Sequence, residues 1–192
     1  NIIKICFIGI ILTISSTASS EIDPLKNINE RTHVLNQTLD LQLASPIARF
    51  YKRVTPDFIE ISITNFTRNI EDLSIAINNI LQGKLNDGIS DITRFTVNST
   101  LGIGGFIDVA SGLGLDKNDE DFGQTLAVWG VSDGPYLVLP GLGPSTMRDT
   151  LAMIPDAFLT PLWLIDHDRT AYSLTAIDLV DSRARYLGLE SV

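Results

Sequence analysis

The chain has 192 residues, which is enough for one domain with a buried core. Its 14 lysines and arginines stand against 23 aspartates and glutamates, and the net charge of -9 excludes the basic surface that a nucleic-acid-binding protein or a polybasic membrane anchor needs. Only 19% of residues are charged and 44% are hydrophobic, with a mean hydropathy of +0.20, a composition typical of neither a disordered chain nor a well-solvated enzyme.

The first residues have the pattern of a secretory signal peptide. A lysine precedes an uncharged apolar run over residues 5–14, which is too short to span a membrane, and small residues follow it. We therefore predict a signal peptide over residues 1–18 and a single domain over residues 19–192; the alternative for the first segment is a buried N-terminal helix. The sole cysteine, Cys6, lies in this segment, so the mature chain would contain no thiol and no disulfide.

Helical periodicity dominates the rest of the chain. Apolar residues recur at steps of three and four over residues 57–81, which predicts a long amphipathic helix between Pro56 and Gly83. Further helices are predicted around residues 30–43, ending at Pro46, and over residues 85–95 and 171–187. The apolar stripe of the long helix consists of Ile59, Ile63, Phe66, Ile70, Leu73, Ile77 and Ile80. The expected fold class is mainly α.

The middle of the chain is rich in glycine and proline. Ten of the 14 glycines fall within residues 102–143, which predicts turns, short helices and close backbone contacts there. Residues 122–147 contain a single charged side chain before Arg148, that of Asp133, and residues 157–165 contain none. Both stretches are compatible with a protein core or with a membrane interface, where Trp and Tyr are favoured.

A search for catalytic chemistry is mostly negative. The sequence Gly102-Ile103-Gly104-Gly105 lacks the last glycine of a dinucleotide loop, and a packing turn explains it better. The acidic run 116–121 lacks the glycine and closing glutamate of a calcium loop, so we expect a solvated loop. His33 and His167 have no nucleophile motif beside them. We expect no catalytic residue, no metal site and no cofactor.

Several glycine- and proline-containing blocks occur together in a characteristic order. They are residues 94–110 (RFTVNSTLGIGGFIDVA), 120–126 (EDFGQTL), 129–131 (WGV), 134–136 (GPY), 139–140 (LP), 143–145 (GPS) and 148–149 (RD). With Asn65-Phe66, Asn69 and residues 78–83 upstream, this set resembles the signature of the MlaA (VacJ) family over about residues 29–187. The early family pattern Phe-Asn-x-x-Leu-Asp is present as residues 35–40 (LNQTLD), without the aromatic residue.

The resemblance implies a ring-like bundle of amphipathic helices that lie in the plane of the membrane around a central channel, with a Gly/Pro-rich loop region. It implies a lipoprotein in the periplasmic leaflet of the outer membrane of a Gram-negative bacterium, and not an enzyme. Members remove phospholipid from the outer leaflet, which maintains lipid asymmetry, associate with a trimeric outer-membrane porin and pass lipid to a periplasmic carrier, MlaC. The alternatives are a structural porin-associated envelope protein and a soluble periplasmic hydrolase or binding protein.

The sequence departs from the family at both ends. Family signal peptides usually end at a lipid-modified cysteine, whereas no cysteine follows Cys6 here. The family also usually continues with an aromatic- and arginine-rich stretch beyond the point that corresponds to Gly188, so we expect part of the family's C-terminal region to be missing.

The functional residues are predicted from these blocks. We expect Asn36, Leu39 and Asp40 to control the channel; the alternative is that Asn36 and Asp40 cap a helix or face water. The Gly/Pro-rich region is expected to line the lipid path, with ordinary turn packing as the alternative at each position. Its predicted members are Gly123, Gly130, Val131, Gly134, Pro135, Tyr136 and Leu137. A basic cluster is expected to contact lipid phosphates, or else to form a solvated helix face. It consists of Arg49, Lys52 and Arg53.

Overall fold

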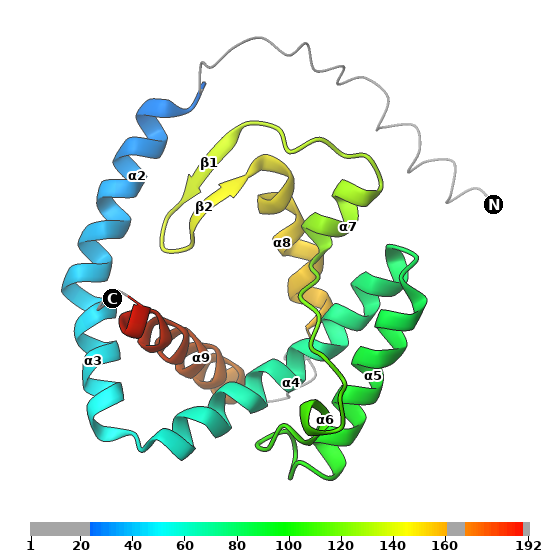
Figure 1. The fold of residues 1–192 in the computed structure, drawn as a ribbon. Coiled ribbons are helices and arrows are strands. Elements are labelled where there is room, and N and C mark those ends of the chain that lie inside the picture. Colours follow the sequence, from blue (N-terminus) through cyan, green and yellow to red (C-terminus); the bar gives the residue numbers. More distant parts are fainter. Residues whose placement is uncertain (1–23, 161–167, 190–192) are drawn as a thin grey trace.

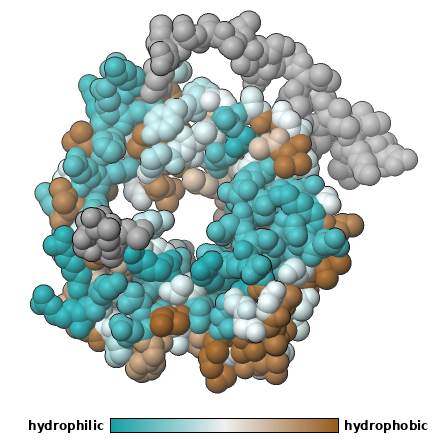
Figure 2. Space-filling model, viewed as in Figure 1, coloured by the Kyte–Doolittle hydropathy of each residue, from teal (hydrophilic) through white to brown (hydrophobic). Residues whose placement is uncertain are grey.

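The computed structural model describes residues 24–160 and 168–189, and the predicted mainly helical fold is confirmed. The helices follow one another around a ring (Figure 1), and the space-filling view shows an opening through its middle (Figure 2). In chain order the elements are α2 (Lys26–Leu39), the π-helix η1 (Asp40–Ala44), α3 (Ser45–Val54), α4 (Asp57–Leu81), α5 (Leu85–Thr100), α6 (Val109–Gly112), α7 (Phe122–Val128), β1 (Tyr136–Leu139), β2 (Gly143–Thr146), α8 (Met147–Leu159) and α9 (Asp168–Leu189).

The long helix α4 has the predicted limits, but it buries its polar residues. It begins after Pro56 and ends before Gly83, whose φ of +84° suits a residue that leaves a helix. Members of the apolar stripe remain exposed, and the exposed fraction is 38% for Ile59 and 41% for Ile80. The residues that α4 buries are Asn69, Asp72, Ile75, Ala76, Asn78 and Asn79. A helix with this arrangement presents apolar side chains outward, the reverse of a helix on a soluble protein.

The predicted helix end at Pro46 is wrong. The chain stays helical from α2 into α3 and passes through the π-helix η1, and Pro46 lies in the first turn of α3. Proline is tolerated in a first turn, and the wider π turn changes the local hydrogen-bond pattern ahead of it. The result is a continuous helical path along one side of the ring (Figure 1).

The glycine-rich middle folds into short elements, as expected, and also into a β-hairpin that we did not predict. Strands β1 and β2 pair antiparallel, with Tyr136 opposite Thr146. The packing-turn interpretation of Gly102 agrees with the structure, since a Cβ at this residue would lie 2.1 Å from the Ile107 carbonyl oxygen. The hairpin lies on the inner side of the ring, facing α2 (Figure 1).

The described residues contain few buried large apolar side chains and many exposed ones. The buried hydrophobic residues are Ala48, Ile75, Ala76, Ala110, Val138, Ala152 and Ala184. Exposed ones include Phe58 at 67%, Phe158 at 70% and Ile103 at 70%. Hydrophobic residues gather on the outside of the ring, near α5 and α6, whereas mainly hydrophilic ones border the opening (Figure 2). None of the helices in the described part of the chain combines the length and the hydropathy needed to cross a bilayer.

Some sequence predictions fall outside the described residues. They are the signal peptide over residues 1–18, the end of the charge-free stretch 157–165, and His167. The predicted helices over 85–95 and 171–187 are confirmed as parts of α5 and α9.

Candidate functional site

The hairpin is attached to the start of α2 by the buried side chain of Asn29. Its Nδ2 donates to the Tyr136 carbonyl at 3.1 Å, and its Oδ1 accepts the Val138 N–H at 2.9 Å. A side-chain amide offers a donor and an acceptor next to each other, so it pairs with an extended backbone much as a neighbouring strand does. Asn29 therefore fixes the position of β1.

Asn36, about two turns further along α2, repeats this pairing at the end of the hairpin. Its Nδ2 donates to the Leu139 carbonyl at 2.8 Å, and its Oδ1 accepts the Gly141 N–H at 2.8 Å. We call Asn29, Asn36 and the backbone that they hold the hairpin clamp. The clamp keeps the hairpin beside the opening of the ring.

The end of α2 is tied to the C-terminal helix through Asp40. Arg183 on α9 donates to both carboxylate oxygens of Asp40, at 2.6 and 2.8 Å, and Ser45 donates to one of them at 3.0 Å. The hydrogen bond from Arg183 lowers the pKa of Asp40 below its usual value. A bidentate pair of this kind fixes orientation as well as distance, so it holds α9 against the π-helix.

A second contact of α9 centres on the fully buried carboxylate of Asp181. Tyr51 on α3 donates to it at 3.1 Å and Thr64 on α4 at 2.7 Å, and Arg185 pairs with it at 2.6 Å. Burial, followed by the charge of Asp181, raises the pKa of Tyr51 to about 12. Tyr51 and Thr64 thus join α9 to α3 and α4 inside the ring, and Arg185 of α9 itself completes the contact (Figure 1).

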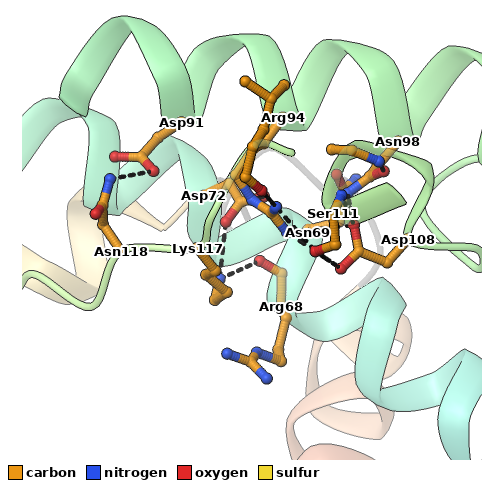
Figure 3. Close-up of polar contacts among 12 residues, drawn as sticks. Arg68, Asn69, Asp72, Asp91, Arg94, Asn98, Asp108, Ser111, Lys117 and Asn118 are labelled. Atoms are coloured by element: carbon orange, nitrogen blue, oxygen red, sulfur yellow. Dashed lines mark hydrogen bonds and ion pairs between the residues drawn. The ribbon is translucent and has the colours of Figure 1, made fainter. Parts of the chain in front are cut away.

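A buried ionic network connects α4, α5 and the loop after α6 (Figure 3). The Arg94 side chain, 3% exposed, lies 3.6 Å from Asp72 and 3.3 Å from Asp108, and Lys117 pairs with Asp72 at 2.8 Å. Burial alone would raise the pKa of Asp108, but hydrogen bonds from Ser111 and Asn98 and the charge of Arg94 lower it to about 2. The network supplies the internal cohesion that large apolar side chains supply in a soluble protein.

An acidic recess of about 440 Å³ lies between α4, α8 and the loop before α7. Burial raises the pKa of Asp156 at its edge, although the Phe122 N–H donates to this carboxylate at 3.0 Å. The recess is lined by Glu71, Ser74, Ile75, Asp119, Glu120, Asp121, Gln124, Asp156 and Thr160. Carboxylates gathered in this way repel anions, so this part of the surface disfavours contact with a phosphate.

The fold of this chain has counterparts in known proteins. The model of the MlaA lipoprotein family matches residues 21–192. The chain belongs to this family. A solved structure described as "Structural basis for maintenance of bacterial outer membrane lipid asymmetry" superimposes with a TM-score of 0.79 at 30% identity, over 89% of this chain and 87% of that chain.

Relatives of known name agree with this assignment to the MlaA family. The chain is 37% identical over 148 residues to the "Intermembrane phospholipid transport system lipoprotein MlaA" of Escherichia coli K12, covering 74% of this chain and 59% of that protein. It is 30% identical over 170 residues to the protein of that name from Haemophilus influenzae, covering 86% and 68%. An uncharacterised protein of Rickettsia conorii is 36% identical over 162 residues, covering 84% and 64%. The chain thus spans somewhat less than two thirds of the length of several relatives.

Within this MlaA-family fold, the structure brings part of the predicted channel segment to the hairpin. Asn36 lies in the hairpin clamp and Asp40 in the contact with Arg183, whereas Leu39 between them is 38% exposed and ends α2. Asn36 and Asp40 are therefore bound to other elements of the ring. Asp40 is also the C-cap residue of α2 and keeps a side chain that is 35% exposed, so the capping alternative describes part of its position.

The predicted Gly/Pro-rich residues divide into two groups. Gly130, Val131, Gly134 and Pro135 form the connection from α7 to the hairpin, and Tyr136 and Leu137 begin β1. Gly123 is buried in α7, where a Cβ would lie 2.6 Å from a carboxylate oxygen of Asp149. Gly123 thus has a packing role, as in the alternative that the sequence left open at this position, although it lies in a helix and not in a turn.

The three basic residues of α3 do not act as one cluster. Lys52 pairs with Glu60 at 3.8 Å, whereas Arg49 and Arg53 border a common recess that Lys52 does not line. The acidic run 116–121 is also more engaged than expected, because Lys117 reaches Asp72, and Glu120 accepts from Lys84 at 2.7 Å. The expectation of a solvated loop is wrong for these two residues.

Sequence reasoning missed the residues that hold α9 and the ionic network. Arg183, Asp181 and Arg94 lie in helices whose periodicity draws attention to apolar positions only. The signal that could have found them is the helix position of the charged residues. Several of these residues occupy positions that would face the core in a helix of a soluble protein.

Proposed function

We propose that the chain moves phospholipid out of the outer leaflet of the bacterial outer membrane, toward the periplasm, through the opening of its ring. The observation that carries the proposal is the combination of exposed large apolar side chains on the outside of the ring with a polar interior (Figure 2). A protein of this kind is compatible with lipid around it and with a headgroup inside it.

The ring would lie in the periplasmic leaflet with its helices in the membrane plane. Amphipathic helices embed by burying one apolar face, and α4 and α5 expose such faces, including Ile61, Ile89 and Ile92. A trimeric outer-membrane porin is the proposed neighbour within the membrane, and a soluble MlaC-like carrier the proposed acceptor in the periplasm. The names of the E. coli and H. influenzae relatives, lipoproteins of an intermembrane phospholipid transport system, support a location at a membrane.

The hairpin clamp would set the width of the path. The residues between α7 and β1, together with Tyr136 and Leu137, would contact acyl chains, and Asn36, Leu39 and Asp40 would hold the opposite side. Tyr136 is 48% exposed, and its hydrogen bonds to other described residues run through its backbone, to Asn29 and to β2. Its ring is therefore available for contact with lipid. Moving a lipid between leaflets breaks no covalent bond, so the proposed activity needs no catalytic residue and no cofactor.

The proposal is tested by purifying the chain from outer membranes in mild detergent and extracting its lipid for native mass spectrometry. We expect a complex with porin that carries phospholipid. A lipid-free monomer that stays monodisperse without detergent would contradict membrane embedding and favour a soluble periplasmic protein. A porin complex that never carries or transfers lipid, with a fluorescent phospholipid in donor vesicles as the probe, would favour a purely structural role.

A further inference from the structure

An open groove of about 420 Å³ runs along α3 beside its junction with η1. It is lined by Leu41, Ser45, Pro46, Arg49, Phe50 and Arg53. Tyr51, which bonds to Asp181 of α9, lies about 200° around the helix from Arg49. Arg49 thus lies on another face of α3 than Tyr51, while Ser45 at one edge of the groove accepts from Arg183 of α9 at 2.9 Å. The groove borders that contact and is separate from the hairpin clamp.

The groove carries two positive charges, and the charge of Arg49 also helps to lower the pKa of the nearby Asp40. Arg49 and Arg53 are one helical turn apart, so their guanidinium groups repel each other. Neither makes a hydrogen bond or an ion pair within the described part of the chain, whereas neighbouring Lys52 is paired with Glu60 at 3.8 Å. An anion placed between the two guanidinium groups would relieve their repulsion and accept hydrogen bonds from both.

Large apolar side chains adjoin these charges. Leu41 is 64% exposed and Phe50 65% exposed, and Ile47 and Val54 on the same short helix are 50% and 55% exposed. A free phosphate matches only the arginines, and an uncharged alkyl chain matches only Leu41 and Phe50. A phospholipid matches both, because its phosphate and its acyl chains leave the glycerol in different directions.

We propose that this groove binds a phospholipid of the leaflet that surrounds the ring, with the phosphate between Arg49 and Arg53 and an acyl chain along Leu41 and Phe50. This lipid is not the transported one, and the inference rests on the proposed embedding of the ring. Bound in this way, it fixes the depth of α3 at the level of the headgroups, since arginine stems extend along apolar surface to reach that level.

The test uses the full chain reconstituted in phosphatidylcholine vesicles that contain a trace of phosphatidylglycerol with a diazirine in one acyl chain. After illumination, peptide mapping with a protease that does not cut at arginine locates the label. We expect labels on α3 and, separately, on the hairpin. The double substitution R49Q/R53Q should reduce α3 labelling by about tenfold or more and leave hairpin labelling unchanged.

The matched control is R31Q, because Arg31 is an exposed arginine of α2 that also makes no hydrogen bond or ion pair within the described residues. This substitution should leave both labels unchanged. Hairpin labels without α3 labels, or α3 labels that R49Q/R53Q does not reduce, would overturn the groove and leave the proposed function standing. An absence of labels on both α3 and the hairpin would overturn the lipid-binding groove and the proposed function together. Loss of the α3 label to millimolar inorganic phosphate, as readily as to unlabelled phosphatidylglycerol, would assign the groove to free phosphate and overturn the lipid assignment.

Discussion

The side chain of Asn36 and the backbone of Gly141 are joined by a hydrogen bond of 2.8 Å across the inner side of the ring. The same amide donates to the Leu139 carbonyl at 2.8 Å, so one residue of α2 satisfies both a donor and an acceptor of the hairpin. Asn29 does the same at the other end of β1. Strand β1 has β2 as its partner in the two-stranded sheet, and the clamp takes the place of a further strand beside β1.

Substitution of Asn36 by Asp should loosen the hairpin without changing side-chain volume. The new carboxylate still accepts from Gly141, but it turns an acceptor toward the Leu139 carbonyl where Asn36 had a donor. We expect a loss of about 1.5 kcal/mol in the opening free energy of the hairpin, which is about tenfold faster hydrogen exchange at its amides. Hydrogen exchange followed by mass spectrometry measures the exchange rates of the hairpin amides.

The control for this substitution is N27D, which adds the same charge to α2 at an exposed residue outside the clamp. It should leave hairpin exchange unchanged. Equal acceleration by N27D and N36D would mean that the charge on α2, and not the lost donor, opens the hairpin.

Breaking the Asp40–Arg183 pair should release α9 from the π-helix. The Asp40 side chain is 35% exposed, so solvent screens part of the interaction, and we expect D40N to lower the free energy of unfolding by only about 1 kcal/mol. R183K keeps the positive charge but cannot form the bidentate pair. We therefore expect R183K to accelerate hydrogen exchange in α9 more than D40N does. Thermal unfolding in detergent and hydrogen exchange measure the two effects.

D116N is the matched control for D40N, because Asp116 lies exposed in the loop before α7. If hydrogen exchange in α9 is unchanged in R183K but faster in D40N, the charge rather than the bidentate geometry holds α9.

The helices were predictable from the sequence because the spacing of apolar residues follows from helix geometry, whatever covers the apolar face. The limits of α4 follow from Pro56 and Gly83, which act on the backbone whatever surrounds the helix. Which face is buried did not follow, since the apolar stripe of α4 predicts one contact surface but does not say whether protein or lipid covers it. Asp72, buried in the structure, lies off that stripe.

The hairpin and the path through Pro46 depend on contacts that local sequence does not encode. Strand β1 is only four residues long, and its pairing relies on Asn29 and Asn36, more than a hundred residues earlier in the chain. A proline at this place favours a helix end in the sequence, whereas in the structure the π-helix η1 runs directly into the first turn of α3, where Pro46 lies. The family pattern located Asn36 and Asp40, but their partners Gly141 and Arg183 came from the structure alone.

Gly102 and Gly112 should respond in opposite directions to an added methyl group. A Cβ at Gly102 would lie 2.1 Å from the Ile107 carbonyl oxygen and 2.5 Å from that of Asn98, and neither backbone atom can move without disrupting the turn. We expect G102A to lower the free energy of unfolding by about 2 kcal/mol or more. Nothing lies within 4 Å of a Cβ at Gly112, so G112A should be neutral or stabilise by about 0.5 kcal/mol. Denaturation in matched detergent compares them, and equal stability of the two variants would refute the crowding at Gly102.

Acid should weaken the ionic network through Asp108. Because the pKa of this carboxyl is lowered to about 2 in the folded chain, its contribution is fully present above about pH 4, the ordinary carboxyl pKa, and is lost as the pH falls toward 2. A difference of nearly two pKa units corresponds to about 2 kcal/mol. D108N should therefore be less stable than the unsubstituted protein by about this amount at pH 7, and the two should converge near pH 2. The raised pKa values of Asp91 and Asp156 act in the opposite sense, but both proteins share them, so they cancel in the difference.

Unfolding free energies measured at steps from pH 7 to pH 2 test this prediction. D116N is the control, and its stability should change with pH in parallel with that of the unsubstituted protein. A gap between D108N and the unsubstituted protein that stays constant down to pH 2 would show that Asp108 acts through its shape and not its charge.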